Sequence, residues 1–499
     1  MEVLQNVLYG FQVALQPTNL IYCFFGVLIG TLVGVLPGLG PAAAIALLLP
    51  STFKTTPVSG IIMLAGIYYG TMYGGSTTSI LVNIPGEAAS VVTCIDGHQM
   101  ALRGRAGPAL GIAAFGSFIA GTFSVIALTL LGPLLAGIAL RFGPPEFFSL
   151  MIVGIMVLTF LSSGSMLKAL MMAAVGLTLG GIGMDAISGT YRFTLNLQAL
   201  LDGVGLVPTV MGLFGISEVL ENLETEFKRD ILAAKVKNLL PTLKDWNESI
   251  GAIARGMILG FFLGIVPGGG AIVASFASYA IEKKMAKRPE EFGKGAIAGV
   301  AGPEAANNSA AGASFIPLLT LGIPANAVMA IFLGALMIHG MAPGPLLMTR
   351  APDLFWGTIV SMYIGNGMLL VLNLPLIPVW VMVLRVPYYI LYPLILLFCI
   401  IGSYSIANNT ADVIIMLIFG VTGYLMRKFR YDAPPLVLAL VLGHALESSF
   451  RRSLMLSRGD FSIFVTRPIS LGFLIVAVLL LIVPIITQRK KLSSLEEHP

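Results

Sequence analysis

The chain has 499 residues, of which 57% are hydrophobic and 11% charged, and its formal net charge is +5. With a mean hydropathy of +0.92, it carries too little charge to cover the surface of a soluble protein of this length, so we predict an all-α polytopic membrane protein. The alternating segments of about ten residues that mark a membrane β-barrel do not occur. The basic residues lie in short loops between apolar segments, which excludes nucleic acid as an expected partner.

The amino terminus lacks the basic region and the small-residue cleavage site of a removable signal peptide. We expect a short amphipathic helix there, lying at the membrane interface. An apolar stretch follows from residue 20 to 50, and Gly-Val-Leu-Pro-Gly-Leu-Gly interrupts it at 34–40. Because glycine tolerates positive φ, this motif predicts a break at which the chain can turn.

Two polar tracts with little charge follow the break. They are Tyr-Gly-Gly-Ser-Thr-Thr-Ser at 73–79 and Asn-Ile-Pro-Gly-Glu at 83–87. Hydroxyl and amide groups can bond a carboxylate or coordinate Na⁺, and they cost less to bury than Lys or Arg. Serine and threonine in membrane helices also bond to their own backbone, so a structural role for any single hydroxyl stays open.

Residues 222–248 form the longest polar stretch and carry an excess of basic residues. The positive-inside rule therefore predicts a cytoplasmic linker. It separates a first repeat half, 1–221, from a second repeat half, 249–499.

The second half repeats the plan of the first. Gly-Ile-Val-Pro-Gly-Gly-Gly at 264–270 matches 34–40 at an offset of 230, and Gly26 and Gly30 match Gly256 and Gly260 at the same offset. Beyond the break the offset becomes 239, which aligns 83–86 with 322–325. The second half has a polar tract of its own at 303–309, which places Glu304 beside Asn307 and Asn308. An acid inside the membrane is a candidate cation ligand or proton carrier.

Matched loops carry unequal charge, which distinguishes inverted from parallel repeats. The loop at 51–57 holds one basic residue while its counterpart at 282–294 holds five; conversely, 98–107 holds two arginines and 337–344 holds none. We therefore predict about ten to twelve membrane elements in two inverted-topology repeats, each with a Gly/Pro-broken segment that forms a re-entrant hairpin. One long tilted helix with a Gly/Pro kink is the alternative for each broken segment.

The helix that resumes after each break presents unpaired N–H groups that favour an anion, and the arriving carbonyl groups can coordinate Na⁺. The predicted substrate-binding residues are Gly38, Leu39, Gly40, Ser76, Thr77, Thr78, Gly268, Gly269 and Gly270. The predicted ion-binding residues are Ser79, Asn83, Glu304, Asn307, Asn308, Ser309 and Asn326. The sequence has no His-Glu-x-x-His, Gly-x-Ser-x-Gly or Walker motif, so we expect no catalytic residue, no cofactor, no tightly bound metal and no ATP coupling. Transport driven by a Na⁺ or H⁺ gradient remains.

The motifs at 34–41, 73–81, 83–87 and 264–270 resemble the large membrane subunit of the tripartite tricarboxylate transporters, the TctA family, and the resemblance extends from about residue 20 to 485. It implies a multi-pass protein of the bacterial inner membrane that imports a di- or tricarboxylate such as citrate with Na⁺ or H⁺. It also implies two partners besides the lipid bilayer: a small TctB-like membrane subunit of about four helices and a periplasmic, TctC-like solute-binding protein. An elevator-like movement of the hairpin domain is implied as well, and a homodimer would suit such a scaffold.

A cation/proton antiporter is the alternative function. It would share inverted repeats and broken helices but would need essential carboxylates deep in the membrane. Neutral polar residues outnumber acids in the tracts described above, which favours the carboxylate importer. A membrane-embedded enzyme or a scaffold subunit is a more distant alternative, because the sequence has no recognised nucleophile, metal or phosphate motif.

Overall fold

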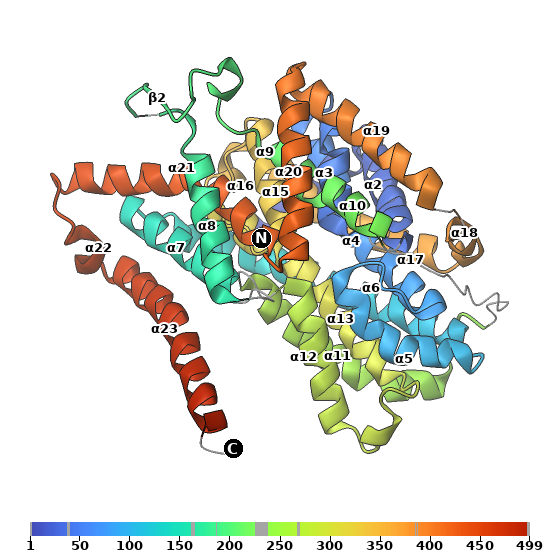
Figure 1. Cartoon of the computed structure of the whole chain (residues 1–499). Helices are drawn as coiled ribbons and strands as arrows, with labels where there is room; N and C mark the ends of the chain where they lie inside the picture. Colours follow the sequence, from blue (N-terminus) through green and yellow to red (C-terminus); the bar gives the residue numbers. More distant parts are fainter. Residues whose placement is uncertain are drawn as a thin grey trace. The chain divides into compact units, whose positions relative to one another are not determined.

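The computed structural model describes residues 2–36, 40–160, 165–185, 187–224, 238–266, 270–384, 386 and 388–496. Helices dominate these residues (Figure 1), as predicted. Seven helices in the described part are long and apolar enough to cross a membrane: Pro17–Val35, Ala106–Ala139, Leu206–Glu224, Leu243–Ile265, Pro352–Asn373, Thr410–Lys428 and Ala433–Leu456. Shorter apolar helices accompany them. The protein is therefore an all-α polytopic membrane protein, and the number of membrane elements stays a prediction.

The chain divides into two compact units that interleave in sequence. Unit 1 comprises Met1–Gly137 and Val207–Tyr424, and unit 2 comprises Ile138–Leu206 and Leu425–Pro499. The two units are defined by packing, whereas the predicted repeat halves, 1–221 and 249–499, are defined by repetition in the sequence. The repeat halves stay a prediction. Part of the predicted linker, 225–237, lies outside the described residues.

The helices of unit 1 up to the start of the second break are α1 Glu2–Ala14, α2 Pro17–Val35, α3 Pro41–Leu48, η1 Leu49–Thr52, α4 Pro57–Val82, η2 Ala88–Ser90, α5 Val91–Leu102, α6 Ala106–Ala139, α9 Leu206–Val210, η4 Met211–Ile216, α10 Ser217–Glu224 and α11 Leu243–Ile265. Those that follow are α12 Gly270–Met285, η5 Pro289–Glu291, α13 Ala298–Ala313, α14 Phe315–Leu321, α15 Ala327–Ile338, α16 Leu347–Arg350, α17 Pro352–Asn373, α18 Ile377–Val383, α19 Tyr388–Ala407 and α20 Thr410–Lys428. The elements of unit 2 are α7 Pro144–Phe160, α8 Met166–Gly180, β1 Gly183–Met184, β2 Tyr191–Arg192, η3 Gln198–Leu200, α21 Ala433–Leu456, α22 Ile463–Thr466 and α23 Pro468–Glu496.

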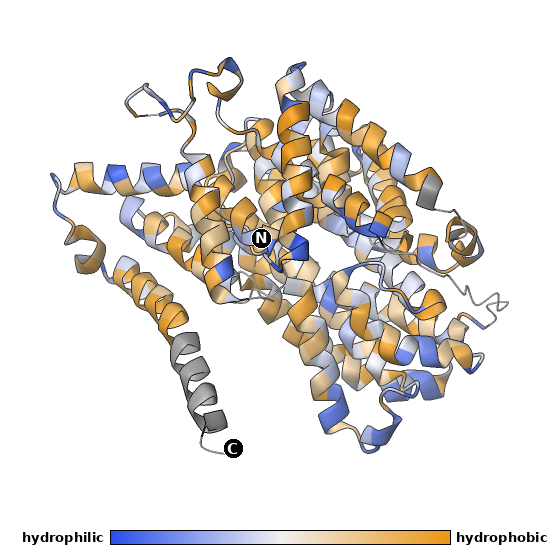
Figure 2. Cartoon of the chain, in the orientation of Figure 1, coloured by the Kyte–Doolittle hydropathy of each residue, from blue (hydrophilic) through white to orange (hydrophobic). Residues whose placement is uncertain are grey.

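The expected amino-terminal helix is α1, and it packs against α17. A Cβ atom on Gly10 would lie 2.7 Å from the carbonyl oxygen of Trp356, so glycine allows the two backbones to approach closely. Hydrophobic residues cover most of the helices in Figure 2, while hydrophilic residues collect at the end of α12. This distribution fits helices that face lipid or one another.

Helices α2 and α4 make their closest contacts through a stripe of glycines. Cβ atoms on the glycines of α2 would lie 2.3–2.6 Å from carbonyl oxygens of α4, in the pairs Gly26 with Met63, Gly30 with Ile67 and Gly34 with Thr71. Real Cβ atoms do not approach so closely, so only glycine fits this contact. Because residue numbers rise together in both helices, α2 and α4 run in the same direction.

Helices α11 and α13 repeat this contact. The pairs are Gly256 with Gly302, Gly260 with Ala306 and Gly264 with Ala310, at 2.2–2.4 Å. Every glycine corresponds to its counterpart in α2 at the offset of 230, and every partner to its counterpart in α4 at the offset of 239. The internal repeat of the sequence is therefore a repeat of packed structure.

Each break reverses the direction of the chain. Since α2 and α4 run in the same direction and Ser59 of α4 donates to Asn19 of α2 at 2.6 Å, the segment between them returns to the start of α2. In the second half, Arg255 of α11 pairs with Glu282 of α12 at 2.5 Å, which joins residues well before and well after the break. Both broken segments are hairpins, and a single kinked helix is excluded.

Corresponding turns follow α4 and α14. Asn83 ends α4 with φ 59°, and Gly322 ends α14 with φ 72°. Both are left-handed cap conformations, which asparagine and glycine adopt more readily than other residues. The two residues correspond at the offset of 239, so the Ile-Pro turn that follows each is also part of the repeat.

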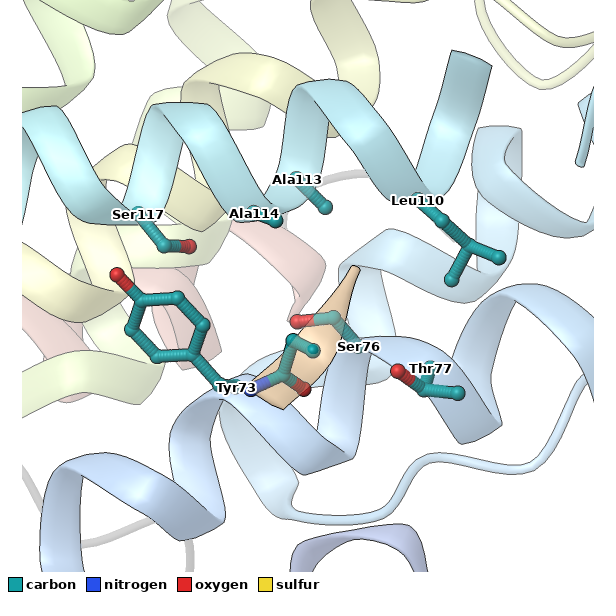
Figure 3. Close-up of a pocket in the computed structure, with 8 residues that line it drawn as sticks. Tyr73, Ser76, Thr77, Leu110, Ala113, Ala114 and Ser117 are labelled. Atoms are coloured by element: carbon teal, nitrogen blue, oxygen red, sulfur yellow. The ribbon is translucent and has the colours of Figure 1, made fainter. Parts of the chain in front are cut away.

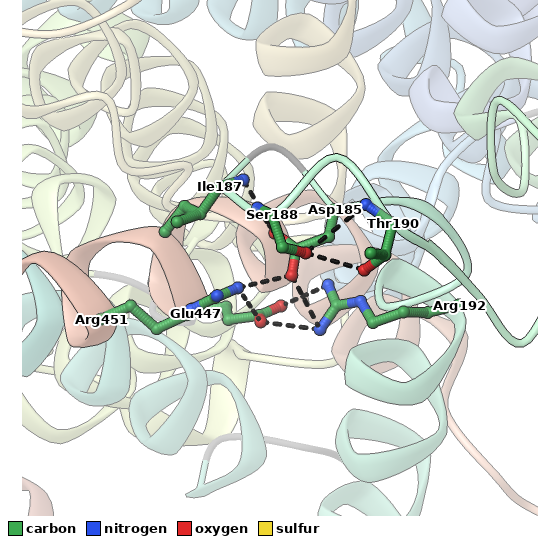
Figure 4. Close-up of polar contacts among 7 residues, drawn as sticks. All are labelled: Asp185, Ile187, Ser188, Thr190, Arg192, Glu447 and Arg451. Carbon is green, nitrogen blue, oxygen red and sulfur yellow. Dashed lines mark hydrogen bonds and ion pairs between the residues drawn. The ribbon is translucent and has the colours of Figure 1, made fainter.

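Unit 2 contains a short ribbon tied to α21 by charge. Strands β1 and β2 pair antiparallel, and Arg192 and Arg451 contact Glu447 at 2.8 and 3.3 Å, while Arg451 also contacts Asp185 at 2.6 Å (Figure 4). The Ile187 amide and the Arg451 guanidinium hold the pKa of Asp185 below its ordinary value. Two cations and two anions therefore anchor this ribbon.

Candidate functional site

The polar residues buried in unit 1 gather where α4, α5 and α13 meet. Glu304, in α13, is 0% exposed. Its carboxylate accepts hydrogen bonds from Ser76 Oγ at 2.6 Å and from Thr93 Oγ1. Among the described residues, no Lys, Arg or His makes an ion pair or hydrogen bond with it. An unpaired carboxylate in such surroundings is costly unless it holds a proton or a cation.

Glu87 is the second buried acid of this region, and it serves as a helix cap. Its carboxylate accepts from the Ala89 amide at the start of η2 and from Asn307 Nδ2 at 3.2 Å. The Ser90 amide also donates to it. All three donors are N–H groups, and the carboxylate faces the amino-terminal end of η2 and α5, where negative charge is stabilised.

Asn326 occupies the same place in the second half. It caps α15 by accepting from the Met329 amide at 2.9 Å, and its Nδ2 donates to Tyr68 Oη at 3.4 Å. Glu87 corresponds to Asn326, and Tyr68 to Asn307, at the offset of 239. Each cap thus contacts the corresponding position of the opposite half. Such an exchange is the sign of a pseudo-two-fold relation between the repeats.

The hairpins follow the same exchange. Helix α3, which resumes after the first break, packs against α15 of the second half, and α12, which resumes after the second break, packs against η2 of the first. Each hairpin therefore contacts the segment that follows the Ile-Pro turn of the other half. The orientation of the pseudo-two-fold axis in the membrane, and with it the inverted topology, stays a prediction.

The predicted residues at the hairpin tips fall partly outside the described residues. Gly38, Leu39, Gly268 and Gly269 lie there. Gly40 is the N-cap of α3, and Gly270 begins α12 with φ 52°, a left-handed conformation that favours glycine. These two glycines therefore stand where the helices resume, as expected.

The remaining predicted residues of α4 and its end differ in what they contact. Thr78 donates to the carbonyl of Val35 at 2.7 Å, and Ser79 donates to Ser90 Oγ at 2.9 Å. Thr77 borders a small cavity together with Ser76. The side chain of Asn83 is exposed. The structure therefore brings Ser76 and Thr77 to the polar cluster and its cavity, and leaves Asn83 at the surface.

The predicted residues of α13 lie on several sides of the helix. Asn307 contacts Glu87, as described, and Asn308 donates to Ser117 Oγ at 2.8 Å and to the carbonyl of Glu304 at 3.1 Å. Ser309 instead donates to the carbonyl of Met257 at 2.7 Å, which ties α13 to α11. Glu304, Asn307 and Asn308 share the polar cluster, while Ser309 contributes to the helix contact.

The cavity lies between α4, α6 and α17 (Figure 3). Its lining residues are Tyr73, Ser76, Thr77, Leu110, Ala113, Ala114, Ser117 and Asn373. The free volume of the cavity is about 10 Å³, which suits about one water molecule.

Asp96, in α5, is a buried acid with a different set of partners. Its Oδ1 accepts from the amides of Gly293, Gly295 and Ala296 at 2.7–2.9 Å, and its Oδ2 accepts from Tyr279 Oη at 2.9 Å. Four donors satisfy this carboxylate. Asp96 therefore fastens α5 to the loop before α13.

Sequence reasoning missed several residues of the cluster. Thr93, Ser117 and Asn373 are ordinary polar residues in apolar helices, and only long-range packing brings Thr93 to Glu304. Glu87 had a usable signal, because it aligns with Asn326 at the offset of 239. Two aligned polar residues that both follow an Ile-Pro turn indicate a shared capping role.

Comparisons with known proteins give one family and two relatives. The family model described as "Tripartite tricarboxylate transporter TctA family" matches residues 20–438. An uncharacterized 52.8 kDa protein in the TAR-I ttuC' 3' region of Agrobacterium vitis is 50% identical over 500 residues, covering 100% of both chains. An uncharacterized protein in the TAR-II ttuC' 3' region of the same organism is 51% identical over 241 residues, covering 48% of this chain and 100% of that protein. No solved structure matches.

Proposed function

Because the chain belongs to the TctA family of tripartite tricarboxylate transporters, we propose that it is the large transmembrane subunit of a binding-protein-dependent secondary transporter. It imports a di- or tricarboxylate such as citrate, and a Na⁺ or H⁺ gradient drives the uptake. It works in the bacterial inner membrane with a TctB-like membrane subunit and a TctC-like periplasmic solute-binding protein. The scaffold forms a homodimer, and the hairpin-bearing part moves against it in an elevator-like manner.

Glu304 is the observation that carries this proposal. A carboxylate at 0% exposure whose two donors are hydroxyl groups needs a proton or a cation to be stable there. An organic anion with two or three negative charges also needs cations to cross the membrane. One buried acid that takes up and releases a cation meets both needs.

The hairpins supply the substrate site in this proposal. Thr78 donates to the Val35 carbonyl at the end of α2, which brings the polar tract of α4 to the first break. Helix α12, which follows the second break, packs against η2. Donors at Gly40 and Gly270, where the helices resume, bind the carboxylate groups of the substrate. Ser76, Thr77 and Thr78 complete the substrate site, with Gly38, Leu39, Gly268 and Gly269 at the tips. The ion site comprises Glu304, Asn307 and Asn308, with Ser79 and Asn326 near it. The predicted ion ligands Asn83, which is exposed, and Ser309, which bonds the Met257 carbonyl, are not part of this site.

Uptake of radiolabelled citrate tests the proposal. Cells that lack their own citrate transporters express the chain with its two partners, and uptake is measured with and without Na⁺ at two external pH values. Concentrative uptake that depends on either gradient and on the binding protein supports the proposal. The absence of gradient-dependent uptake for citrate and for other di- and tricarboxylates contradicts it.

The buried acids favour one second candidate, a cation/proton antiporter. Glu87 and Glu304 interact electrostatically inside the same cluster, and such pairs can exchange Na⁺ for H⁺. Everted membrane vesicles separate the two candidates. Exchange of Na⁺ for H⁺ without any organic anion would favour the antiporter.

A further inference from the structure

One residue that lines the small cavity beside Ser76 carries a buried acceptor that has no partner among the described residues. Asn373 is 4% exposed, and its Nδ2 donates to the Leu369 carbonyl at 2.9 Å. Within the part of the chain that the structure describes, Oδ1 of Asn373 has no hydrogen-bond partner. Leaving such an atom unsatisfied costs about 1–3 kcal/mol. A donor in the cavity would remove that cost.

The cavity has the properties of a site for one water molecule. Its free space fits about one water, and Ser76, Thr77 and Ser117 line it together with Asn373. A buried water usually makes two to four hydrogen bonds to such groups. Figure 3 shows the residues of α6 along one wall and those of α4 along the other.

The two hydroxyl groups that donate to Glu304 differ in their position relative to this cavity. Ser76 donates to Glu304 and lines the cavity, whereas Thr93 donates to Glu304 and is not among the lining residues. One donor therefore connects the carboxylate to the cavity, and the other holds it from the side of α5. This difference gives Ser76 a role that Thr93 cannot share.

We propose that the cavity binds one water molecule and that Glu304 exchanges its proton with this water through Ser76. Ser76 passes its hydroxyl proton to Oε2 of Glu304 while Oγ takes a proton from hydronium in the cavity. Carboxylate and hydronium become carboxylic acid and water, with one O–H bond broken and one formed at Ser76. The reverse steps release the proton. The inference rests on the proposed function, because it makes H⁺ the coupling ion.

Few other titratable groups face Glu304. Tyr73 of α4, Cys94 of α5 and Glu87 before η2 interact with it electrostatically. The hydroxyl of Tyr73 donates to Asn366 Oδ1 at 2.6 Å, and Glu87 is held by its capping bonds.

The acids of the neighbouring helices are also engaged. Arg255 of α11 pairs with Glu282 of α12, and Asp96 of α5 has its four donors. Tyr73 is the titratable residue among those that line the cavity, and its hydroxyl is engaged with Asn366. Ser76 lines the cavity and donates to Glu304, so the route that we consider passes through water and Ser76.

Infrared spectroscopy of the purified full chain in lipid nanodiscs tests the relay. The carbonyl band of protonated Glu304 is assigned by its loss in Glu304→Gln, and its exchange rate is followed after a rapid change of pH. Ser76→Ala should slow the exchange by about tenfold or more, because the relay loses its proton carrier. Thr93→Val is the comparison: it also removes one hydroxyl donor from Glu304 but leaves the cavity lining intact, so it should slow the exchange less than Ser76→Ala does.

A second set of variants tests the water site without touching Glu304. Asn373→Leu removes the unpaired oxygen, and Ala114→Val fills the cavity from α6. Both should slow the exchange as Ser76→Ala does, and thermal unfolding checks that each variant is folded. These variants keep the test decisive if Ser76→Ala does not fold.

Two results would overturn the relay. Equal exchange rates in Ser76→Ala and Thr93→Val would show that the cavity is not part of the path. Loss of the protonated band on addition of Na⁺, with wild-type exchange in Asn373→Leu, would assign the cluster to Na⁺. Failure of the proposed function is a separate outcome: the exchange pattern would appear while no carboxylate is taken up.

Discussion

Helix α5 joins the two halves of unit 1 through two buried acids that are held in different ways. Thr93 of α5 donates to Glu304 of α13, and Asp96 of α5 accepts from the loop that precedes α13. Both acids are 0% exposed, and both contacts cross between the halves. Burial alone therefore does not distinguish the two acids.

The donors make the distinction. Three of the four donors to Asp96 are backbone amides, which can only donate and are fixed in place by the loop. Hydroxyl groups donate or accept after a rotation about one bond, so the site of Glu304 suits the carboxylate and the protonated acid alike. We therefore regard the Asp96 site as a fixed connection and the Glu304 site as one that can change its charge.

The largest expected effect is on transport by Glu304→Gln. This variant keeps the shape of the side chain but cannot bind or release a proton, so gradient-driven citrate uptake should fall by at least about 100-fold. Because a neutral amide can still bond both hydroxyls, the melting temperature should change by less than about 3 °C. Radiotracer uptake and thermal unfolding of the purified chain measure the two quantities.

An exposed acid of the same unit provides the control for Glu304→Gln. Glu248 lies at the surface of α11, 3.9 Å from Lys244, and Glu248→Gln should leave both uptake and melting temperature near wild type. Uptake by Glu304→Gln at the wild-type rate would contradict the role given to the hydroxyl-bound acid.

Asp96→Ala should show the reverse pattern. Its removal leaves three amides and the Tyr279 hydroxyl without their common acceptor, so the free energy of unfolding should fall by about 2–4 kcal/mol. Tyr279→Phe, which removes one of the four donors, should cost about 0.5–1.5 kcal/mol. Denaturant unfolding in detergent measures both. A loss of uptake without loss of stability in Asp96→Ala would make Asp96 a functional acid and remove the distinction.

The sequence predicts the helices and their internal repeat better than it predicts how the helices group into compact units. The glycines at 26, 30 and 34 and their counterparts at 256, 260 and 264 mark the repeat in the sequence, and in the structure they form the same close helix contact in both halves. The two interleaved units could not be predicted, because they depend on which distant helices pack together. For example, α8 meets α21 through Gly176 and Leu436, a pairing that no local pattern announces.

The candidate site was predictable to the extent that its residues stand together in the sequence. Glu304, Asn307 and Asn308 lie within two turns of one helix, and their helical spacing brings them to one cluster. Thr93 and Asn373 come from distant helices and carry no charge, so neither spacing nor composition marks them. Their roles follow from packing alone.

Glu87→Gln should have an intermediate effect, which sharpens the comparison between the two kinds of site. Glu87 is bonded by three N–H groups, as Asp96 is, but it lies in the cluster of Glu304. Replacing the capping carboxylate by an amide should lower the free energy of unfolding by about 1 kcal/mol. Citrate uptake should fall by less than about tenfold, because Glu304 keeps its own donors. A loss of uptake as large as that of Glu304→Gln would instead place both acids in the coupling step.

The smallest effect is expected at Asp185 of unit 2, where a third arrangement combines amides with an arginine. The Ile187 amide and Arg451 lower the pKa of Asp185 in the folded state. A lowered pKa means that the carboxylate stabilises the ribbon above the pKa of the unfolded chain, about 4, and that this stabilisation is lost as the pH falls through the folded pKa. Hydrogen exchange of residues 183–192, corrected for its intrinsic pH dependence, should therefore be constant from neutral pH down to about 4 and faster below.

Asp185→Asn should exchange faster already at neutral pH and lose the acid-dependent rise, whereas Asp202→Asn, at an exposed position of the same unit, should behave as wild type. Arg192 and Arg451 are 30% and 33% exposed, so water screens the ion pairs and the change should be modest. If the exchange rate of Asp185→Asn rose in acid by as much as that of the wild type, protonation of Asp185 would not be the cause of the rise. The Asp185 carboxylate would then not anchor the ribbon in the way that the Asp96 carboxylate anchors its loop.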